Sequence, residues 1–230
     1  MLTESAYQSG SSVHLFSRAA RRDPSAGFRP LGRSIERMGA LMPYPRNAEI
    51  YGEKEPADCF YKVISGIVRT SRAVIDGRRQ IGAFYLPGDV FGLESGEEHA
   101  FSAEAVMDAK LLVVNRGAVV SLAACDNDVA RQLWTLMGRE LQRAQDHVLL
   151  LVKTALERVA GFLLEMADRI QSSDEVELPM SRQDIADYLG LTIETVSRML
   201  TQLANASAIS LPTSKRIVLR NRAILKRLIA

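Results

Sequence analysis

Short apolar runs separated by glycines fill the segment from residue 50 to about residue 114. Three of these runs, at residues 60–64, 80–86 and 111–114, have the length of strands and lie between turn signals. The Asp76-Gly77 pair favours a tight turn between two strands. This pattern predicts a small all-β roll.

The pattern changes to a helical period after residue 126, where apolar positions recur at steps of three to five residues. The helix expected from about residue 128 to residue 153 is longer than the roughly 8 to 20 residues of most globular helices. Its stripe has the β-roll as one partner, and its length favours the same helix of a second copy as another. The positions expected in that dimer interface are Val129, Leu133, Leu136, Leu141, Ala144, Val148 and Leu151.

A second amphipathic helix is expected over residues 156–170, and two short helices follow after residue 180. Ser181 begins the first of these, and Asp184 completes a capping-box pattern. Gly190 permits the tight turn that ends it, and Thr192 caps the next helix. Their inner faces carry the apolar positions Ile185, Ala186, Leu189, Val196, Leu200 and Leu203. Two helices joined in this way are typical of a helix-turn-helix.

The outer face of the second short helix carries side chains suited to base edges. Arg198 offers a planar fork that matches guanine O6 and N7. Glu194 can accept a hydrogen bond from the amino group of cytosine or adenine, and Ser197 is short enough to approach a base edge or a thymine methyl group. These three residues are the expected base contacts; the alternative is an ordinary exposed polar face.

After this unit, residues 209–220 have the pattern of two short strands around a turn, a wing, and residues 221–229 that of a final helix. Lys215 and Arg216 lie at the tip of the wing, where the alternatives are a phosphate contact and a solvated charged turn. The expected contacts to the DNA backbone are Ser181, Arg182, Thr192, Thr195, Lys215 and Arg216.

The net charge of +2 conceals an uneven distribution. From Pro179 to the end, eight Lys and Arg residues stand against three acidic ones, a charge of +5, whereas the rest of the chain carries −3. The basic end has the sign of a phosphate-binding surface, although a solvated face can also be basic.

Other compositional features exclude several classes of protein. No stretch approaches the roughly 18 apolar residues of a membrane span, no signal core is evident, and Glu4 and Asp23 disfavour a transit peptide. A cytoplasmic protein with no membrane partner is therefore expected. Two cysteines, Cys59 and Cys125, are too few for a disulfide framework or a metal-ligand cluster. The three histidines, His14, His99 and His147, are scattered, so no metal is expected.

The stretch from Ser181 to Arg198 resembles the DNA-binding motif of the CRP/FNR superfamily, and its Glu-Thr-Val-Ser-Arg run is similar to the FNR and FixK branch. Phe60-Tyr61-Lys62-Val63-Ile64-Ser65-Gly66 and Pro87-Gly88-Asp89-Val90-Phe91-Gly92 resemble the sensor β-roll of that family. The resemblance implies a homodimeric activator that contacts RNA polymerase. It also implies that Glu194, Ser197 and Arg198 contact bases of a TTGA-type half-site within a palindrome. The turn from Asp76 to Arg79 is a weak candidate for the polymerase contact.

The expected fold class is α+β: an N-terminal jelly roll like a cyclic-nucleotide-binding domain, a long dimerisation helix and a C-terminal winged helix-turn-helix. Residues 1–30 are rich in Ser, Arg and Ala without a sustained period, which predicts a mobile arm. The expected boundaries are 31–125 for the sensor-like roll, 126–153 for the dimerisation helix and 154–230 for the DNA-binding domain.

A small-molecule effector is not expected. In the cyclic-AMP-binding members of the family, a glutamate and an arginine hold the ribose and phosphate at positions that Leu93 and Phe101 occupy here, although Glu94 lies one step away. A phenyl ring offers an anion neither charge nor N–H groups. The N-terminal arm contains no cysteines for an iron-sulfur centre. No cofactor is expected, and two alternatives stay open: a regulator gated by a ligand in an unrecognised pocket, and a cupin-like enzyme, which would need the metal-ligand cluster that this chain lacks.

Overall fold

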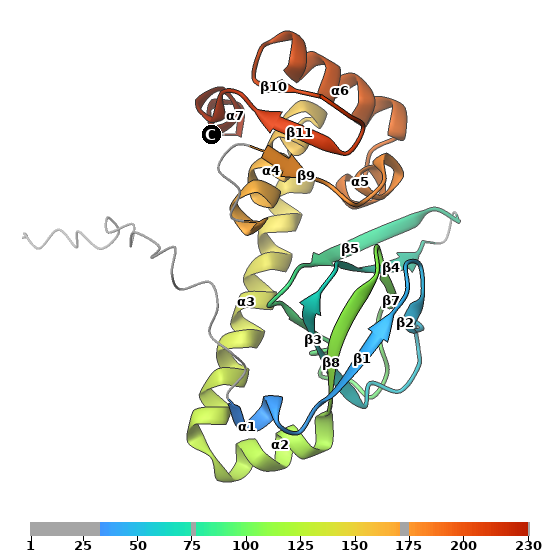
Figure 1. The fold of residues 1–230 in the computed structure, drawn as a ribbon, viewed down its shortest axis with the longest axis vertical. Coiled ribbons are helices and arrows are strands. Elements are labelled where there is room, and N and C mark those ends of the chain that lie inside the picture. The colour runs from blue at the N-terminus through green and yellow to red at the C-terminus, as the bar shows by residue number, and fades with distance from the viewer. Residues whose placement is uncertain (1–32, 75–76, 171–174, 230) are drawn as a thin grey trace, which may run out of the picture.

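The computed structural model describes residues 33–74, 77–170 and 175–229. A β-roll and a helical C-terminal domain lie at opposite ends of the molecule, and one long helix runs along the side of both (Figure 1). The mobile arm predicted over residues 1–30 lies outside the described residues. The predicted α+β class, with its roll, long helix and helix-turn-helix domain, is confirmed.

The roll consists of two four-stranded antiparallel sheets with strand orders β1-β8-β3-β6 and β2-β7-β4-β5. Helix α1 (Arg33–Glu36) precedes it and α2 (Arg116–Cys125) follows it. The strands are β1 (Ala40–Tyr44), β2 (Glu49–Tyr51), β3 (Cys59–Ser65), β4 (Val68–Ala73), β5 (Arg79–Tyr85), β6 (Val90–Phe91), β7 (Ser102–Ala105) and β8 (Ala109–Asn115). The three strands expected from the sequence correspond to β3, β5 and β8.

Alternation along the strands places the core of the roll between its two sheets. Val63, Val68 and Leu111 are completely buried there, beside a group of aromatic rings. The Asp76-Gly77 pair, at which the sequence predicts a tight turn, lies in the connection between β4 and β5. Asp76 lies outside the described residues, but Gly77 has a φ of +82°, which favours glycine because it lacks a Cβ atom.

The long helix α3 spans Asn127–Leu151, close to the expected limits. Asp126 caps it by accepting hydrogen bonds from the backbone N–H groups of Asp128 and Val129. Residues 152–154 separate it from α4 (Ala155–Ile170), the second amphipathic helix expected from the sequence. The two helices are therefore distinct elements joined by a short break.

The seven predicted interface positions of α3 do not share one environment. Val129 is only 2% exposed and belongs to a core cluster that also holds residues of β3 and β8, so it is unavailable to a second copy. Leu133 and Leu136 pack against the same cluster. Leu141, Ala144 and Val148 are exposed, and Leu151 is half-buried. The predicted stripe thus combines a face packed on the roll with a face left open.

The C-terminal domain packs α4, α5 (Arg182–Leu189), α6 (Ile193–Asn205) and α7 (Arg222–Ile229) against a small sheet. The sequence predicted two strands here, but the sheet has three, in the antiparallel order β10-β11-β9. The third, β9 (Glu175–Glu177), precedes the helix-turn-helix and pairs with β11 (Arg216–Leu219), while β10 (Ile209–Ser210) lies on the other side of β11. The wing is therefore tied to the segment before α5.

Among the described residues, no helix is long and apolar enough to cross a membrane.

Candidate nucleic-acid interface

The turn between α5 and α6 is built by local interactions that the sequence encodes directly. The Ser181 hydroxyl accepts a hydrogen bond from the Asp184 backbone N–H at 3.0 Å, and Asp184 Oδ2 accepts from the Ser181 backbone N–H, also at 3.0 Å. This is the predicted capping box. Gly190 ends α5 with a φ of +60°, and Thr192 caps α6 by accepting from the Thr195 N–H. The geometry fixes α6 across α5, as in a helix-turn-helix.

Helix α6 has one buried face and one exposed face. Val196, Leu200 and Leu203 are at most 2% exposed and hold the helix in the domain core. Glu194, Ser197, Arg198 and Thr201 are exposed on the other side. This face, which we call the reading face, brings the three predicted base contacts together near the N-terminus of α6.

The chemistry of the reading face suits base edges. Hydrogen bonds from the backbone N–H of Glu194 and from the Thr192 hydroxyl hold the pKa of the Glu194 carboxyl below its usual value, so it is an ionised acceptor near neutral pH. Ser197 donates its hydroxyl proton to the Ile193 carbonyl at 2.9 Å, which leaves its lone pairs to accept from a base. Arg198 presents its donors from the same exposed face.

The predicted phosphate contacts occupy varied environments. The hydroxyls of Ser181 and Thr192 are exposed but already take part in the two helix caps. Arg182 and Thr195 are half-buried, and burial lowers the pKa of Arg182. Lys215 is exposed at the turn of the wing.

Arg216 differs from the simple phosphate contact that the sequence suggested. Its Nη2 atom donates to Glu175 Oε2 at 2.6 Å, so an acidic residue of β9 already shares its charge. This partner could not be predicted from the sequence, because the pairing of β9 with β11 brings together residues about forty positions apart. Lys215 is therefore the better phosphate candidate of the two.

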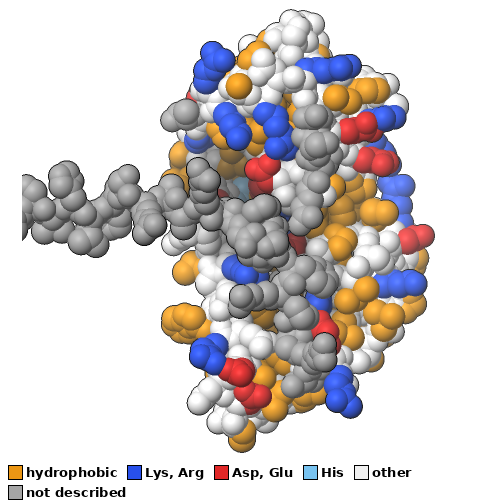
Figure 2. All heavy atoms as spheres, turned by 60° about the vertical axis from the view of Figure 1, so that its left-hand side comes forward, with side chains coloured by type: hydrophobic (Ala, Val, Ile, Leu, Met, Phe, Trp, Pro, Cys, Tyr) orange, Lys and Arg blue, Asp and Glu red, His pale blue; other side chains and the backbone are white. Residues whose placement is uncertain are grey.

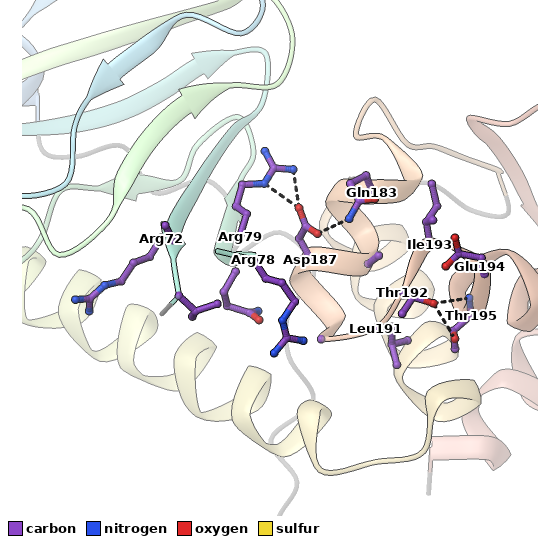
Figure 3. Close-up of a pocket in the computed structure, with 15 residues that line it drawn as sticks. Arg72, Arg78, Arg79, Gln183, Asp187, Leu191, Thr192, Ile193, Glu194 and Thr195 are labelled. Carbon is purple, nitrogen blue, oxygen red and sulfur yellow. Dashed lines mark hydrogen bonds and ion pairs between the residues drawn. The ribbon is translucent and has the colours of Figure 1, made fainter. Parts of the chain in front are cut away.

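The structure also shows a group of charged residues that sequence reasoning missed, in the contact between the roll and α5. Arg79 of β5 donates from Nε to Asp187 Oδ2 at 2.8 Å and from Nη2 to Asp184 Oδ1 at 2.6 Å. Figure 3 shows the Arg79 side chain pointing from the roll toward Asp187, which Gln183 contacts from the opposite side. Arg69 of β4 reaches the same Asp184 oxygen at 3.0 Å. We call Arg69, Arg79, Asp184 and Asp187 the interdomain clamp.

Asp184 stays ionised in this setting. Burial alone would raise its pKa, but hydrogen bonds from Ser181 and the charges of Arg69 and Arg79 outweigh that effect and hold the pKa below its ordinary value. A depressed carboxyl pKa contributes stability that is present above the unfolded-state pKa and is lost only as the pH falls through the lower folded-state value. Asp184 is thus ionised at neutral pH. Arg79, placed here, is engaged with α5 and is not a free member of the turn considered for polymerase contact.

A cavity of about 390 Å³ lies between the roll and α3. Leu93 and Phe101 both line it, as expected from the sequence, and the Phe101 ring lies directly over Gly82. The described lining contains no Lys or Arg, and its charged side chains are the carboxylates of Glu94 and Glu140. Such a lining is unfavourable for an anion.

His99 is a core residue. It is 2% exposed and stacks on Tyr51 with ring centroids 3.5 Å apart. Glu94, the residue one step from the expected ribose position, turns toward it, with Oε1 3.3 Å from His99 Nδ1. No group of three potential metal ligands occurs within the described part of the chain, and His14 lies outside it.

Comparisons with known proteins agree with this architecture. Residues 41–126 match the model of a cyclic nucleotide-binding domain, and residues 157–228 match that of a Crp-like helix-turn-helix domain. The chain is 51% identical to the nitrogen fixation regulation protein FixK of Azorhizobium caulinodans, over 84% of this chain and 81% of that protein. It is 40% identical to the transcriptional activatory protein AadR of Rhodopseudomonas palustris, over 74% and 73% of the two chains.

Among solved structures, the chain is similar to FixK2 from Bradyrhizobium japonicum, with a TM-score of 0.80 and 51% identity over 84% of this chain and 98% of that one. The relatives are named as transcriptional regulators, which confirms the prediction that the chain is not an enzyme and removes the cupin-like alternative. The two domain models match in the expected order, and the relatives are 40% to 51% identical to this chain. The chain therefore belongs to the CRP/FNR family of transcription regulators.

Proposed function

We propose that the protein is a FixK-like transcription activator that binds a TTGA-type palindrome as a homodimer and needs no small-molecule effector. It works in the cytoplasm, with double-stranded DNA, a second copy of itself and RNA polymerase as partners. The observation that carries this proposal is the reading face of α6, where an ionised Glu194, Ser197 and Arg198 lie exposed on a helix fixed by two caps. Activation is inferred from relatives such as AadR, which is named as an activator.

The homodimer is supported by the open face of α3. Trp134, Leu141 and Val148 are spaced by seven residues and are 80%, 60% and 62% exposed. Met137, Ala144 and Leu151 lie three residues after each of them, which completes the a and d positions of a coiled-coil repeat. In Figure 2, which is turned so that the left-hand side of Figure 1 comes forward, hydrophobic side chains lie among charged ones on the parts of the surface that are not drawn in grey. We call these six residues the α3 seam; three of them, Leu141, Ala144 and Val148, are exposed members of the predicted interface.

Effector independence is supported by the lining of the cavity between the roll and α3. Cyclic AMP carries a phosphate, and the lining would oppose it with the carboxylates of Glu94 and Glu140 in place of an arginine. Desolvating the anion without a partner costs several kcal/mol, enough to remove useful affinity.

The purified protein, with its metal content and visible spectrum checked, is therefore expected to bind a TTGA-type palindrome equally well with and without cyclic AMP. Fluorescence anisotropy on labelled duplexes measures this, with a scrambled duplex as the control for nonspecific binding. A tenfold rise in affinity with the nucleotide, or a coloured or metal-bearing protein, would overturn effector independence. Failure to prefer the palindrome over the scrambled duplex would overturn the proposed DNA site itself.

The alternative is a regulator gated by a ligand of another class. The 390 Å³ cavity favours it, because its lining is mostly apolar and aromatic. In that case the protein alone would bind the palindrome weakly, and extracts of its native cells would restore tight binding through a dialysable molecule. The same titrations distinguish the two hypotheses.

The wing gives a separate prediction about affinity without specificity. Lys215→Ala removes an exposed charge at the turn, so it should weaken binding to all sequences alike and lower the salt slope by roughly one for each protomer. Arg216→Ala is the matched comparison and should have the smaller effect, because Glu175 already pairs with Arg216. Titrations at several salt concentrations measure both slopes. A loss confined to the palindrome would instead assign Lys215 to base recognition.

A further inference from the structure

The helix-turn-helix is joined to the roll by an apolar contact and by the interdomain clamp. In the apolar part, Phe84 of β5 lies with its ring centroid 5.2 Å from that of Tyr188 on α5. The same core cluster contains Ile81 and Leu86 of the roll together with the buried residues of α5 and α6. Apolar burial is non-directional and fixes distance better than rotation. Orientation therefore depends on the directed bonds around it.

The clamp supplies directed bonds at the point where α5 begins. Asp184 uses Oδ2 to cap the helix through Ser181 and Oδ1 to accept from Arg69 and Arg79. One carboxylate therefore ties the N-terminus of the first helix of the DNA-binding unit to two strands of the roll. Its side chain is 5% exposed, so water competes little for these bonds.

Arg69 is itself held in place before it reaches α5. Its Nε and Nη2 atoms donate to Glu104 Oε2 at 2.9 and 2.7 Å, and Glu104 is its partner across β4 and β7. Only Nη1 extends to Asp184. Arg79 forms a second anchor by donating to Asp187, which lies about one turn further along α5 than Asp184. Two anchors one turn apart restrain rotation of α5 as well as its position.

The connection between α3 and α4 would otherwise allow such rotation. Residues 152–154 belong to neither helix, so the C-terminal domain follows a break in the chain. A second fixed point bridges the break: Asp89 of the roll accepts from Arg143 of α3 at 3.0 Å and from Arg169 of α4 at 2.6 Å. That network lies beside α3 and α4, whereas the clamp reaches the helix-turn-helix itself. Two further contacts meet the last turn of α5 at the Tyr188 carbonyl oxygen, which lies 3.4 Å from Gln80 Nε2 of β5 and 2.8 Å from His147 Nε2 of α3. The clamp differs from them because its bonds are ionic and begin at the N-terminus of α5.

We propose that Arg69 and Arg79 are positioning residues for DNA recognition, which act through Asp184 and Asp187 to set the orientation of the reading face relative to the roll. The inference rests on the proposed function, because a palindrome can be read only when both recognition helices of a dimer face successive major grooves about 34 Å apart. The clamp performs the orienting role without a ligand. Because desolvation offsets much of the attraction within a buried ion pair, such pairs add little net stability compared with apolar packing. We therefore assign the clamp an orienting role.

Asp187→Asn is the most informative change. It removes a negative charge near the DNA-binding surface, so electrostatics alone predicts tighter DNA binding. The clamp predicts the opposite: at least about fivefold weaker binding to the palindrome, with affinity for an isolated half-site within about twofold of the unchanged protein. It also predicts that discrimination between the best spacer and spacers changed by one base pair falls by at least about fivefold. Anisotropy titrations on these duplexes measure all three quantities.

Arg79→Gln should behave in the same way. The double variant with Asp187→Asn should bind no more weakly than Arg79→Gln alone, because Arg79→Gln already removes the contact with Asp187 in addition to the one with Asp184. Arg79→Lys should recover part of the spacer discrimination by restoring the charge. Arg72→Gln is the matched control, since Arg72 lies in the same hairpin but pairs with Glu53 of the roll at 3.0 Å. Asp187→Asn with unchanged or tighter binding, or an equal loss on half-site and palindrome, would overturn the proposal.

A measurement without DNA separates this inference from the proposed site. Spin labels at exposed positions 97 of the roll and 202 of α6, in a Cys59→Ser and Cys125→Ser background mixed with excess unlabelled protein, report the distance between the two domains. The distance distribution should be narrow with the clamp intact and broader in Arg79→Gln. An unchanged distance distribution would overturn the orienting role of the clamp, even if the protein binds the proposed palindrome. A broader distribution would support that role, even if the protein recognises a different DNA sequence.

Discussion

Replacing Arg198 with alanine is expected to weaken binding to the palindrome by about 1 to 3 kcal/mol for each half-site, and therefore by roughly 2 to 6 kcal/mol for the dimer. That range begins at a loss of about thirtyfold in affinity. The loss follows from geometry: a planar guanidinium can donate two parallel hydrogen bonds to guanine O6 and N7, and alanine donates none. Discrimination at that one base pair should relax, while nonspecific binding should fall little.

The Arg198→Ala substitution is expected to leave the fold of the domain unchanged. Arg198 is exposed, so its truncation removes no core packing, and the caps at Ser181 and Thr192 stay intact. Arg198→Lys keeps the charge but loses the fork, so it should resemble alanine if the contact is to a base and the unchanged protein if it is to a phosphate. Gln202→Ala, also exposed on α6, is the control for the helix surface. Equal losses on specific and scrambled duplexes would make Arg198 a backbone contact.

The reading face was predictable because its determinants are local. The hydroxyl of Ser181, the carboxylate of Asp184, the positive φ of Gly190 and the cap at Thr192 depend on residues within a few positions of one another. Helical periodicity then assigns Val196 to the core and Arg198 to the surface. A single sequence contains all of this information, and the same reasoning found β3, β5 and β8 of the roll.

The interdomain clamp could not be predicted in this way. Arg69 and Asp184 are 115 positions apart, and Arg79 and Asp187 are 108 apart. Nothing in the sequence around an arginine on a strand tells which distant carboxylate it will meet, so Arg79 was seen only as part of a turn. Strand β9 was missed for a related reason: three residues are too few to show a period, and the pairing with β11 is a tertiary effect.

The long helix α3 shows a third limit of prediction from the sequence. A broad apolar stripe on a helix that has two neighbours contains two faces, and periodicity alone does not separate them. Val129 and Leu133 face the roll, whereas Leu141 and Val148 remain exposed. Trp134, 80% exposed, was not assigned to the interface at all, although its spacing of seven from Leu141 places it in the α3 seam. Only burial in the folded chain distinguishes the two faces.

Leu141→Glu in the α3 seam is expected to convert the dimer to a monomer and to abolish tight binding to the palindrome. Leu141 contributes to the lining of the cavity between the roll and α3, but it is 60% exposed in the single chain. The substitution therefore removes no buried core residue and acts where a second copy would cover the helix. Full burial of a leucine is worth roughly 1.5 to 3 kcal/mol, each dimer contains two copies, and two unpaired carboxylates facing each other across the seam add a further cost. The dimerisation constant should therefore weaken by at least about a hundredfold.

Val148→Glu, one heptad further along, should have the same effect, while Arg139→Glu is the matched control because it places a glutamate on the exposed side of α3 outside the seam. Sedimentation velocity measures the oligomeric state, and anisotropy compares the palindrome with an isolated half-site. A monomer retains one reading face, so half-site affinity should change little while the advantage of the palindrome disappears, because the second half-site is no longer tethered. Intact dimers in both Leu141→Glu and Val148→Glu would show that the two copies associate through another surface, and α3 would lose this role.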